Sequence, residues 1–173
     1  MRQSPGGSSA VAARAAAAAA QAIRLRKAGR RLRRLSGGVK YNPLTGERPV
    51  LSPELDQELA AIEQIVNEIQ QGAGERGDDE SALATYGDAA ARQIRSGHEA
   101  VAREAQAIAA AVAVLRGILS TPEDARLDAP YGLGAPKRHH PGALCTIVAA
   151  RAEGLAAALE SMAIAKLNLI GAR

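Results

Sequence analysis

A long apolar stripe between residues 94 and 119 constrains the fold of this chain more than any other feature of its sequence. Apolar residues recur there at alternating steps of four and three positions, with His98 among them, and this spacing places them on one side of an α-helix. A helix with such a stripe needs other helices to cover it. We therefore expect an assembly seam that includes Ile94, Val101, Ile108, Val112, Leu115 and Leu119.

The core has to be built without large aromatic side chains. The 173 residues include no Phe, no Trp and three Tyr, so Ala, Leu, Ile and Val must supply the apolar volume. A fully buried Leu or Ile contributes roughly 1.5–3 kcal/mol, and Ala contributes much less. We expect a chain that is not stable as an isolated monomer and that associates through Ile108, Val112 and Leu115. The alternative is that the other helices of the same chain cover this seam.

Helical signals extend over most of the sequence and predict an all-α fold. Ser52, Pro53 and Glu54 form a helix start, with a capping side chain, a proline in the first turn and an acid near the positive end of the helix dipole. We predict an elongated bundle or antiparallel array of about four main helices, with a basic helical arm at the N-terminus.

The predicted segments are an N-terminal arm, a connector and a helical domain, over residues 1–38, 39–52 and 53–173. The helix of the arm is expected to begin at the alanine run over residues 10–20. Within the helical domain we expect an acidic helix at 53–71, a polar loop at 72–87, a central helix at 88–119, a short helix at 122–127, a second loop at 128–142 and a C-terminal helix at 143–170.

Positive charge is concentrated at the start of the chain. Residues 1–48 hold eleven Lys or Arg and one acid, for a net charge of +10, whereas the whole chain carries +4 and the remainder therefore −6. Residues 51–80 hold nine Asp or Glu against Arg76 alone. The cations that we assign to an acidic partner or a polyanion are Arg24, Arg26, Lys27, Arg30, Arg31, Arg33 and Arg34.

Four interpretations of this basic arm are open. It packs against a protein surface, such as the acidic helix at 53–71, or it binds nucleic acid. The absence of interleaved aromatic side chains favours phosphate contacts over base stacking. The arm also resembles an organellar presequence, since its first 46 residues are rich in Ala and Arg and free of acids. Attachment to an anionic membrane surface is the fourth interpretation, and the lack of aromatic anchors argues against it.

The residue types that perform catalysis or bind metals do not form a recognisable pattern. His139, His140 and Cys145 lack the spacing of a zinc site, and Cys145 is the single cysteine. We interpret Cys145 as a small buried residue on a helix, with a thiol activated by the basic residues at 137–140 as the alternative. We interpret His98 as a satisfied residue in a helix interface. We therefore expect no metal, no cofactor and no catalysis.

These observations favour a non-enzymatic structural subunit of a larger assembly, such as a virus or phage particle. Its Ala/Leu seams would pack against copies of the chain or other proteins, and its basic arm would contact an acidic partner. The alternatives are a sequence-nonspecific nucleic-acid-binding protein, architectural or packaging-related, and an organellar subunit with a presequence. We find no window with the roughly 18 uncharged apolar residues of a membrane span. A membrane partner is therefore not expected, and a cytoplasmic or virion location is favoured over an organellar matrix.

Overall fold

The computed structural model describes residues 5–41, 49–120 and 140–171, and every regular element in these ranges is helical. The all-α prediction is therefore confirmed. The elements are α1 (Pro5–Ser36), α2 (Pro53–Gln71), α3 (Ala73–Leu83), a 3-10 turn η1 (Ala84–Tyr86), α4 (Asp88–Ser120) and α6 (Pro141–Gly171).

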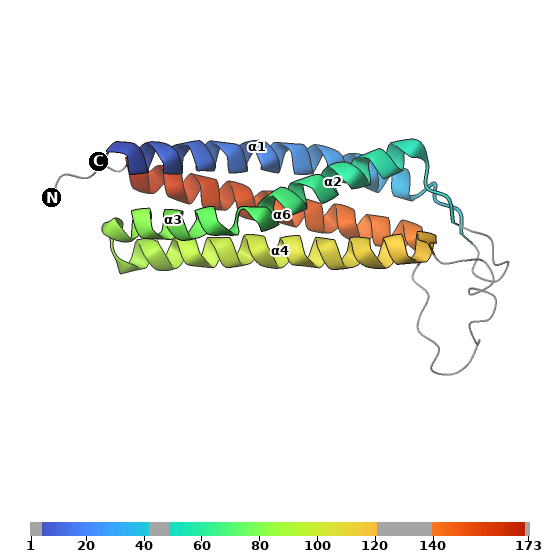
Figure 1. Cartoon of the computed structure of the whole chain (residues 1–173). Helices are drawn as coiled ribbons and strands as arrows, with labels where there is room; N and C mark the ends of the chain where they lie inside the picture. Colours follow the sequence, from blue (N-terminus) through green and yellow to red (C-terminus); the bar gives the residue numbers. More distant parts are fainter. Residues whose placement is uncertain (1–4, 42–48, 121–139, 172–173) are drawn as a thin grey trace.

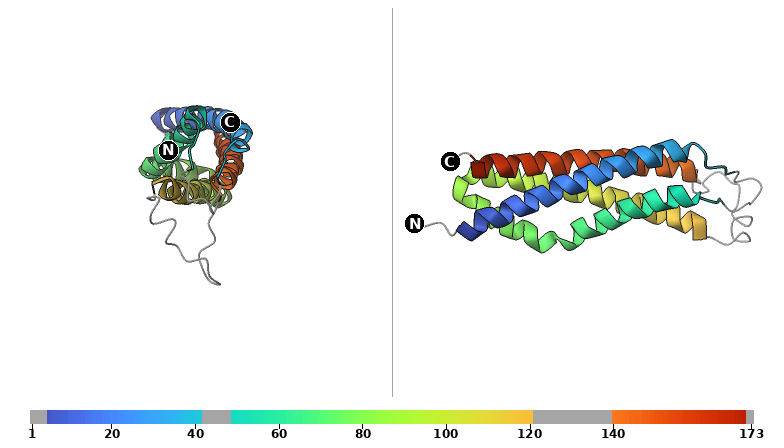
Figure 2. Two further views of the ribbon diagram at one scale, coloured as in Figure 1. Left: turned by 90° about the vertical axis from the view of Figure 1, so that its right-hand side faces the viewer. Right: turned by 90° about the horizontal axis from the view of Figure 1, so that it is seen from above.

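The helices form an elongated antiparallel bundle (Figure 1). α1 and α4 run in one direction, whereas α6 and the pair α2–α3 run in the other. α2 and α3 follow each other along one edge, and the chain bends between them (Figure 2). α6 packs against both α1 and α4, and α2 closes the bundle by packing against the same two helices. The arrangement is that of a four-helix bundle whose second member is broken at Gly72.

The basic N-terminal segment is a full member of this bundle. α1 begins at Pro5, earlier than the predicted start at residue 10, and continues to Ser36. Its apolar side chains recur every three or four residues and are buried, among them Leu25 and Leu32. The buried side chains of α1 at the core are Val11, Ala15, Ala18, Ala22, Leu25, Ala28 and Leu32. The term arm therefore describes its charge and not its packing.

Small residues allow α1 and α6 to approach closely. Gly29 is buried against α6, and a Cβ atom built on it would lie 3.2 Å from the carbonyl oxygen of Ala149. At the start of α6, a Cβ atom on Gly142 would lie 2.8 Å from the carbonyl oxygen of Ser36. Close backbone contact replaces the aromatic volume that this sequence lacks, because short distances restore dispersion contacts.

The predicted assembly seam lies inside the single chain. Ile94, Val101, Ile108, Val112 and Leu115 are buried by the neighbouring helices of the same bundle, and Leu119 is half-buried. The expectation that a second chain covers this stripe is wrong for these residues. α6, α2, α3 and η1 of the same chain pack against α4, and two of these elements come from the segment predicted to be a loop.

The polar loop predicted at 72–87 is also wrong, because α3 and η1 occupy most of it. Gly74 and Gly77 weaken the helix-forming tendency of this stretch. Tertiary contacts compensate for this weakness: Leu83 packs into a small core cluster with Val11 and Ile94, and Asp79 is buried in ion pairs.

Other predicted boundaries agree with the structure. The Ser52 hydroxyl accepts a hydrogen bond from the amide of Leu55 at 3.2 Å, so the predicted cap of α2 is confirmed. The central and C-terminal helices lie within two residues of their predicted limits. Three stretches fall outside the described residues: residues 42–48 of the connector predicted at 39–52, the short helix predicted at 122–127, and residues 128–139 of the loop predicted at 128–142.

Candidate functional site

A buried ionic cluster joins three helices near the α3 end of the bundle. Asp79 of α3 is 1% exposed and Lys166 of α6 is 3% exposed. One carboxylate oxygen of Asp79 accepts from the Lys166 ammonium at 2.5 Å, and the other accepts from Nε of Arg14, on α1, at 2.6 Å. A charged group that is buried away from water requires a partner of opposite charge. The Asp79 carboxylate has two such partners, Lys166 and Arg14.

His98 extends this polar region from α4. Its Nδ1 lies 3.2 Å from a carboxylate oxygen of Glu80, on α3. Burial, reinforced by the positive charge of Lys166, lowers the pKa of His98 below its ordinary value. The imidazole is therefore neutral at pH 7, with Nδ1–H donating to Glu80 and the Nε2 lone pair free to accept. Nε2 is buried and has no hydrogen-bond partner among the described residues. The interpretation of His98 as a satisfied interface residue is therefore correct for Nδ1 and wrong for Nε2.

A pocket of about 130 Å³ opens onto this cluster. The buried Asp79, His98 and Lys166 and the half-buried Arg14 contribute its polar wall, and Leu159 belongs to the apolar part of the lining. The described cations and carboxylates around it are balanced in number. This arrangement neutralises charge within the bundle, and it aligns no nucleophile with a base.

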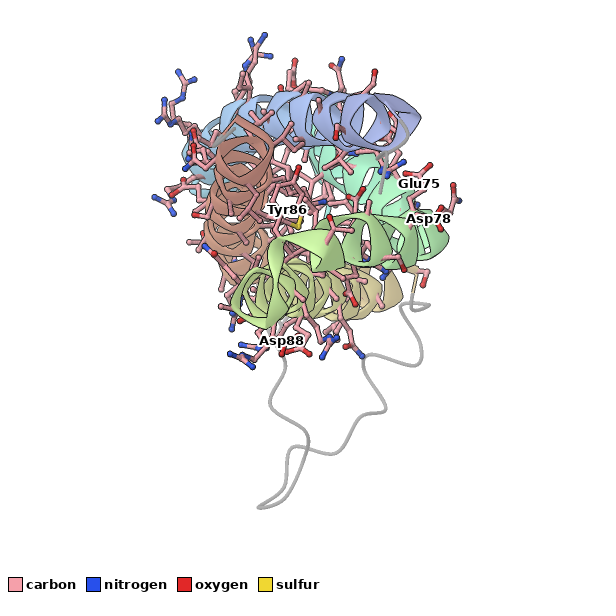
Figure 3. All side chains as sticks on the ribbon, turned by 90° about the vertical axis from the view of Figure 1, so that its left-hand side faces the viewer. Glu75, Asp78, Tyr86 and Asp88 are labelled. Carbon is pink, nitrogen blue, oxygen red and sulfur yellow. The ribbon has the colours of Figure 1, made fainter. Side chains whose placement is uncertain are left out.

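Acidic side chains lie on the solvent side of the same end. Figure 3 looks along the bundle from this end, where Glu75 and Asp78 lie on the outer side of α3 and Tyr86 lies over the interior. Glu75 and Asp78 are exposed, and Tyr86 is half-buried. The ionic cluster thus holds α3 against α1 and α6 from inside the bundle, and the solvent side of α3 is acidic.

Of the residues considered for metal binding or thiol chemistry, Cys145 and His140 are described by the structure. Cys145 is buried on α6, as predicted, and burial raises the pKa of its thiol to about 11. Nδ1 of His140 accepts a hydrogen bond from the Gly142 amide at 3.0 Å, and its ring makes an edge contact with Tyr41. His139 lies outside the described residues. Among those described, no three His, Cys, Asp or Glu side chains are grouped to hold a metal ion.

The predicted basic residues of α1 divide into two groups. Four of them form ion pairs with neighbouring helices: Arg24 with Glu68, Arg31 with Glu58, Arg26 with Glu160 and Arg33 with Glu153. The first two pairs join α1 to the acidic helix α2, and the last two join it to α6. Lys27, Arg30 and Arg34 are exposed and pair with no described carboxylate. We call these three residues the free basic face.

α6 carries an uncharged surface along the outside of the bundle. We define this outer α6 face by Ala143, Ile147, Ala150, Gly154, Ala157, Ser161, Ile164 and Asn168, all of which are exposed. Ile147 is 47% exposed and Ile164 is 53% exposed. Ion pairs border the face on both sides, with Arg151–Glu104 toward α4 and Arg33–Glu153 toward α1.

By length and composition, α6 is the one helix in the described part of the chain that could cross a membrane. Half of its most apolar window is buried inside the bundle, which is equally typical of a core helix. The ion pairs of Arg151, Glu153 and Glu160 with neighbouring helices also favour a helix within a protein bundle.

Sequence reasoning missed the partners of Lys166 and Asp79 and the exposure of the outer α6 face. A signal for the first was present, since Lys166 interrupts an apolar stretch and a buried lysine needs a counter-charge. The outer face carries no such signal, because its small residues read equally well as core positions. A scan of protein-family models and searches of curated proteins and solved structures found no match to this chain.

Proposed function

We propose that this protein is a non-enzymatic structural subunit that assembles with other protein chains through the outer α6 face. The observation that carries the proposal is a solvent-facing row of eight uncharged residues, which extends along most of α6 and includes two large aliphatic side chains. Most exposed helix faces carry charged residues. A long uncharged face with a charged border has the composition of a protein contact, apolar at the centre and polar at the rim.

The interior of the bundle supports a structural role. Its buried polar groups are engaged in joining α1, α3, α4 and α6, and they leave no aligned nucleophile, base and acid. A bundle whose apolar core is covered inside one chain can present α6 to a neighbour without unfolding any helix.

Light scattering of the purified chain over a range of micromolar concentrations tests the proposal. We expect the apparent mass to rise with concentration, and Ile147→Glu to abolish this rise because it replaces one of the two large aliphatic side chains of the contact by a charge. Val114→Glu is the matched control, since Val114 is 45% exposed on α4 and lies outside the face. A compact monomer at every concentration would contradict assembly through α6.

The free basic face supports a second function, which is binding to a polyanion such as nucleic acid. Its three cations are exposed and unpaired with described acids, so they can neutralise phosphates. Replacing Lys27, Arg30 and Arg34 by Gln should reduce the slope of log affinity against log salt by about 2–3. Arg92→Gln with Arg103→Gln, exposed positions on α4, serves as the control. Affinity for unrelated duplexes should be equal, and an unchanged salt slope would exclude this face.

A further inference from the structure

The outer α6 face has nearly the same pattern read from either end. A point midway between Leu155 and Ala156 divides it into two halves. Ile147 precedes this point by as many residues as Ile164 follows it. The same relation holds for the pairs Gly154 with Ala157, Ala150 with Ser161 and Ala143 with Asn168. Small residues therefore occupy the middle, and the two exposed isoleucines stand at equal distances on either side.

We propose that the occupant of this face is a second copy of the chain, with its α6 antiparallel and related by a twofold axis through that midpoint. Ile147 of one copy then packs against the partner's Ile164, and Gly154 lies opposite the partner's Ala157. This inference rests on the proposed assembly function and specifies its geometry. An isologous contact needs a surface that is complementary to itself. Alternating steps of four and three make the positions of any such row symmetric, so the residue types are what select a second copy: antiparallel pairing brings Ile147 and Ile164 together because they lie at equal distances from the midpoint, with small residues between them. A parallel pair would need no such symmetry and would also align the two helix dipoles unfavourably.

The charged border fits this arrangement. On the α1 side, the Arg33–Glu153 and Arg26–Glu160 pairs lie beside the face. Antiparallel pairing about the midpoint places Glu153 two positions along the axis from the partner's Glu160, which is about 3 Å at the rise of an α-helix. Each carboxylate arrives with its own guanidinium, so charges of both signs meet and can exchange partners across the contact.

The size of the face suits a reversible dimer. The stretch from Ala143 to Asn168 is about 37 Å long at 1.5 Å per residue, and one helix is about 10 Å wide. Two such strips bury roughly 800 Å², which is below the 1,200–2,000 Å² of stable complexes and within the range of transient ones. The ion pairs of α1 and α4 at the border add area. We therefore expect a weak dimer that forms as the protein concentration is raised.

Cysteine cross-linking tests the geometry directly. Ile147→Cys and Ile164→Cys are made as separate proteins, each also carrying Cys145→Ala so that no native thiol competes. Each is oxidised alone and in an equimolar mixture at the concentration where wild-type mass rises. We expect the mixture to form disulfide-linked dimers at least about tenfold faster than either protein alone, since the paired thiols are held at a high effective concentration.

Each cysteine variant oxidised alone distinguishes an antiparallel from a parallel pair, because the distance between two identical positions differs between them. In the antiparallel dimer the two copies of Ile147 lie 17 positions apart along the axis, or about 26 Å, and a disulfide needs Cα atoms within about 7 Å. Gln57→Cys, exposed on α2, replaces one member of the mixture as the control. The control mixture should react as slowly as the single proteins.

Three results would overturn the inference, and they separate it from the proposed function. Rapid dimers from either single protein would indicate a parallel pair, so that the twofold geometry fails and assembly through α6 stands. Equal slow reaction in all samples, with a mass that still rises with concentration, would place assembly on another face. A chain that stays monomeric by light scattering would contradict both the twofold dimer and the proposed function. The same conclusion would follow if that monomer floated with phosphatidylcholine vesicles, because the outer α6 face would then contact lipid and not protein.

Discussion

Removing the carboxylate of Asp79 tests what holds α3 on the bundle. Asp79 is buried and accepts from both Lys166 and Arg14. In Asp79→Leu the Lys166 ammonium stays buried without a counter-charge, whereas Arg14, with a side chain 27% exposed, can turn toward water. Breaking a buried ion pair by removing one partner costs about 3–5 kcal/mol. Since total stability is on the order of 5–15 kcal/mol, the variant should lose a large part of it.

Urea unfolding followed by far-ultraviolet circular dichroism at pH 7 measures this loss. Lys166→Met should cost less, about 1–3 kcal/mol, because Asp79 keeps Arg14. The double variant should be more stable than the sum of the single effects predicts, by more than about 1 kcal/mol, because it contains no buried unpaired ammonium. Asp78→Leu, an exposed neighbour on α3, should change stability by no more than about 0.5 kcal/mol. If Asp79→Leu costs no more than Asp78→Leu, or if the effects of Asp79→Leu and Lys166→Met simply add, then Asp79 is not the counter-charge that Lys166 requires.

Three further predictions concern other parts of the bundle. Gly29→Leu should destabilise the fold by about 1–3 kcal/mol in the same urea assay, because its side chain would displace α6 at Ala149; unchanged stability would show that the helices are less closely packed. Burial and the charge of Lys166 lower the pKa of His98 in the folded state. Below about pH 6.5 the unfolded state therefore binds a proton at His98 more readily than the folded state does. The free energy of unfolding should consequently fall as the pH decreases below that value, by up to about 1.4 kcal/mol per pH unit. His98→Gln should remove this part of the pH dependence and His140→Gln should leave it, and equal pH profiles for both variants would contradict the assignment. The buried Cys145 thiol, whose pKa is raised to about 11, should react with iodoacetamide at pH 8 only on unfolding, whereas prompt labelling of the folded chain would mean that the core around α6 opens readily.

The helices were predictable wherever local chemistry and apolar spacing agreed. The Ser52 cap, the proline after it and the four-and-three spacing of α4 are local signals, and each predicted an element that the structure contains. The prediction failed at α3, where the local signals are two glycines and a run of acids. Contacts between distant residues, above all Asp79 with Lys166, determine that segment, and their separation of 87 residues leaves no trace in local spacing.

The sequence by itself determined the fold class, the positions of the long helices and the asymmetry of charge, because these depend on residue order within one segment. Only the tertiary structure decided which apolar faces meet one another. The central stripe and the outer α6 face are both rows of uncharged residues at helical spacing, yet Ile108 is fully buried and Ile164 is 53% exposed. Packing also decided which cations of α1 are paired and which form the free basic face, since the carboxylates that reach them come from α2 and α6. The physical reason is that a helical pattern specifies a direction about its own axis, whereas its exposure depends on which other helices lie in that direction.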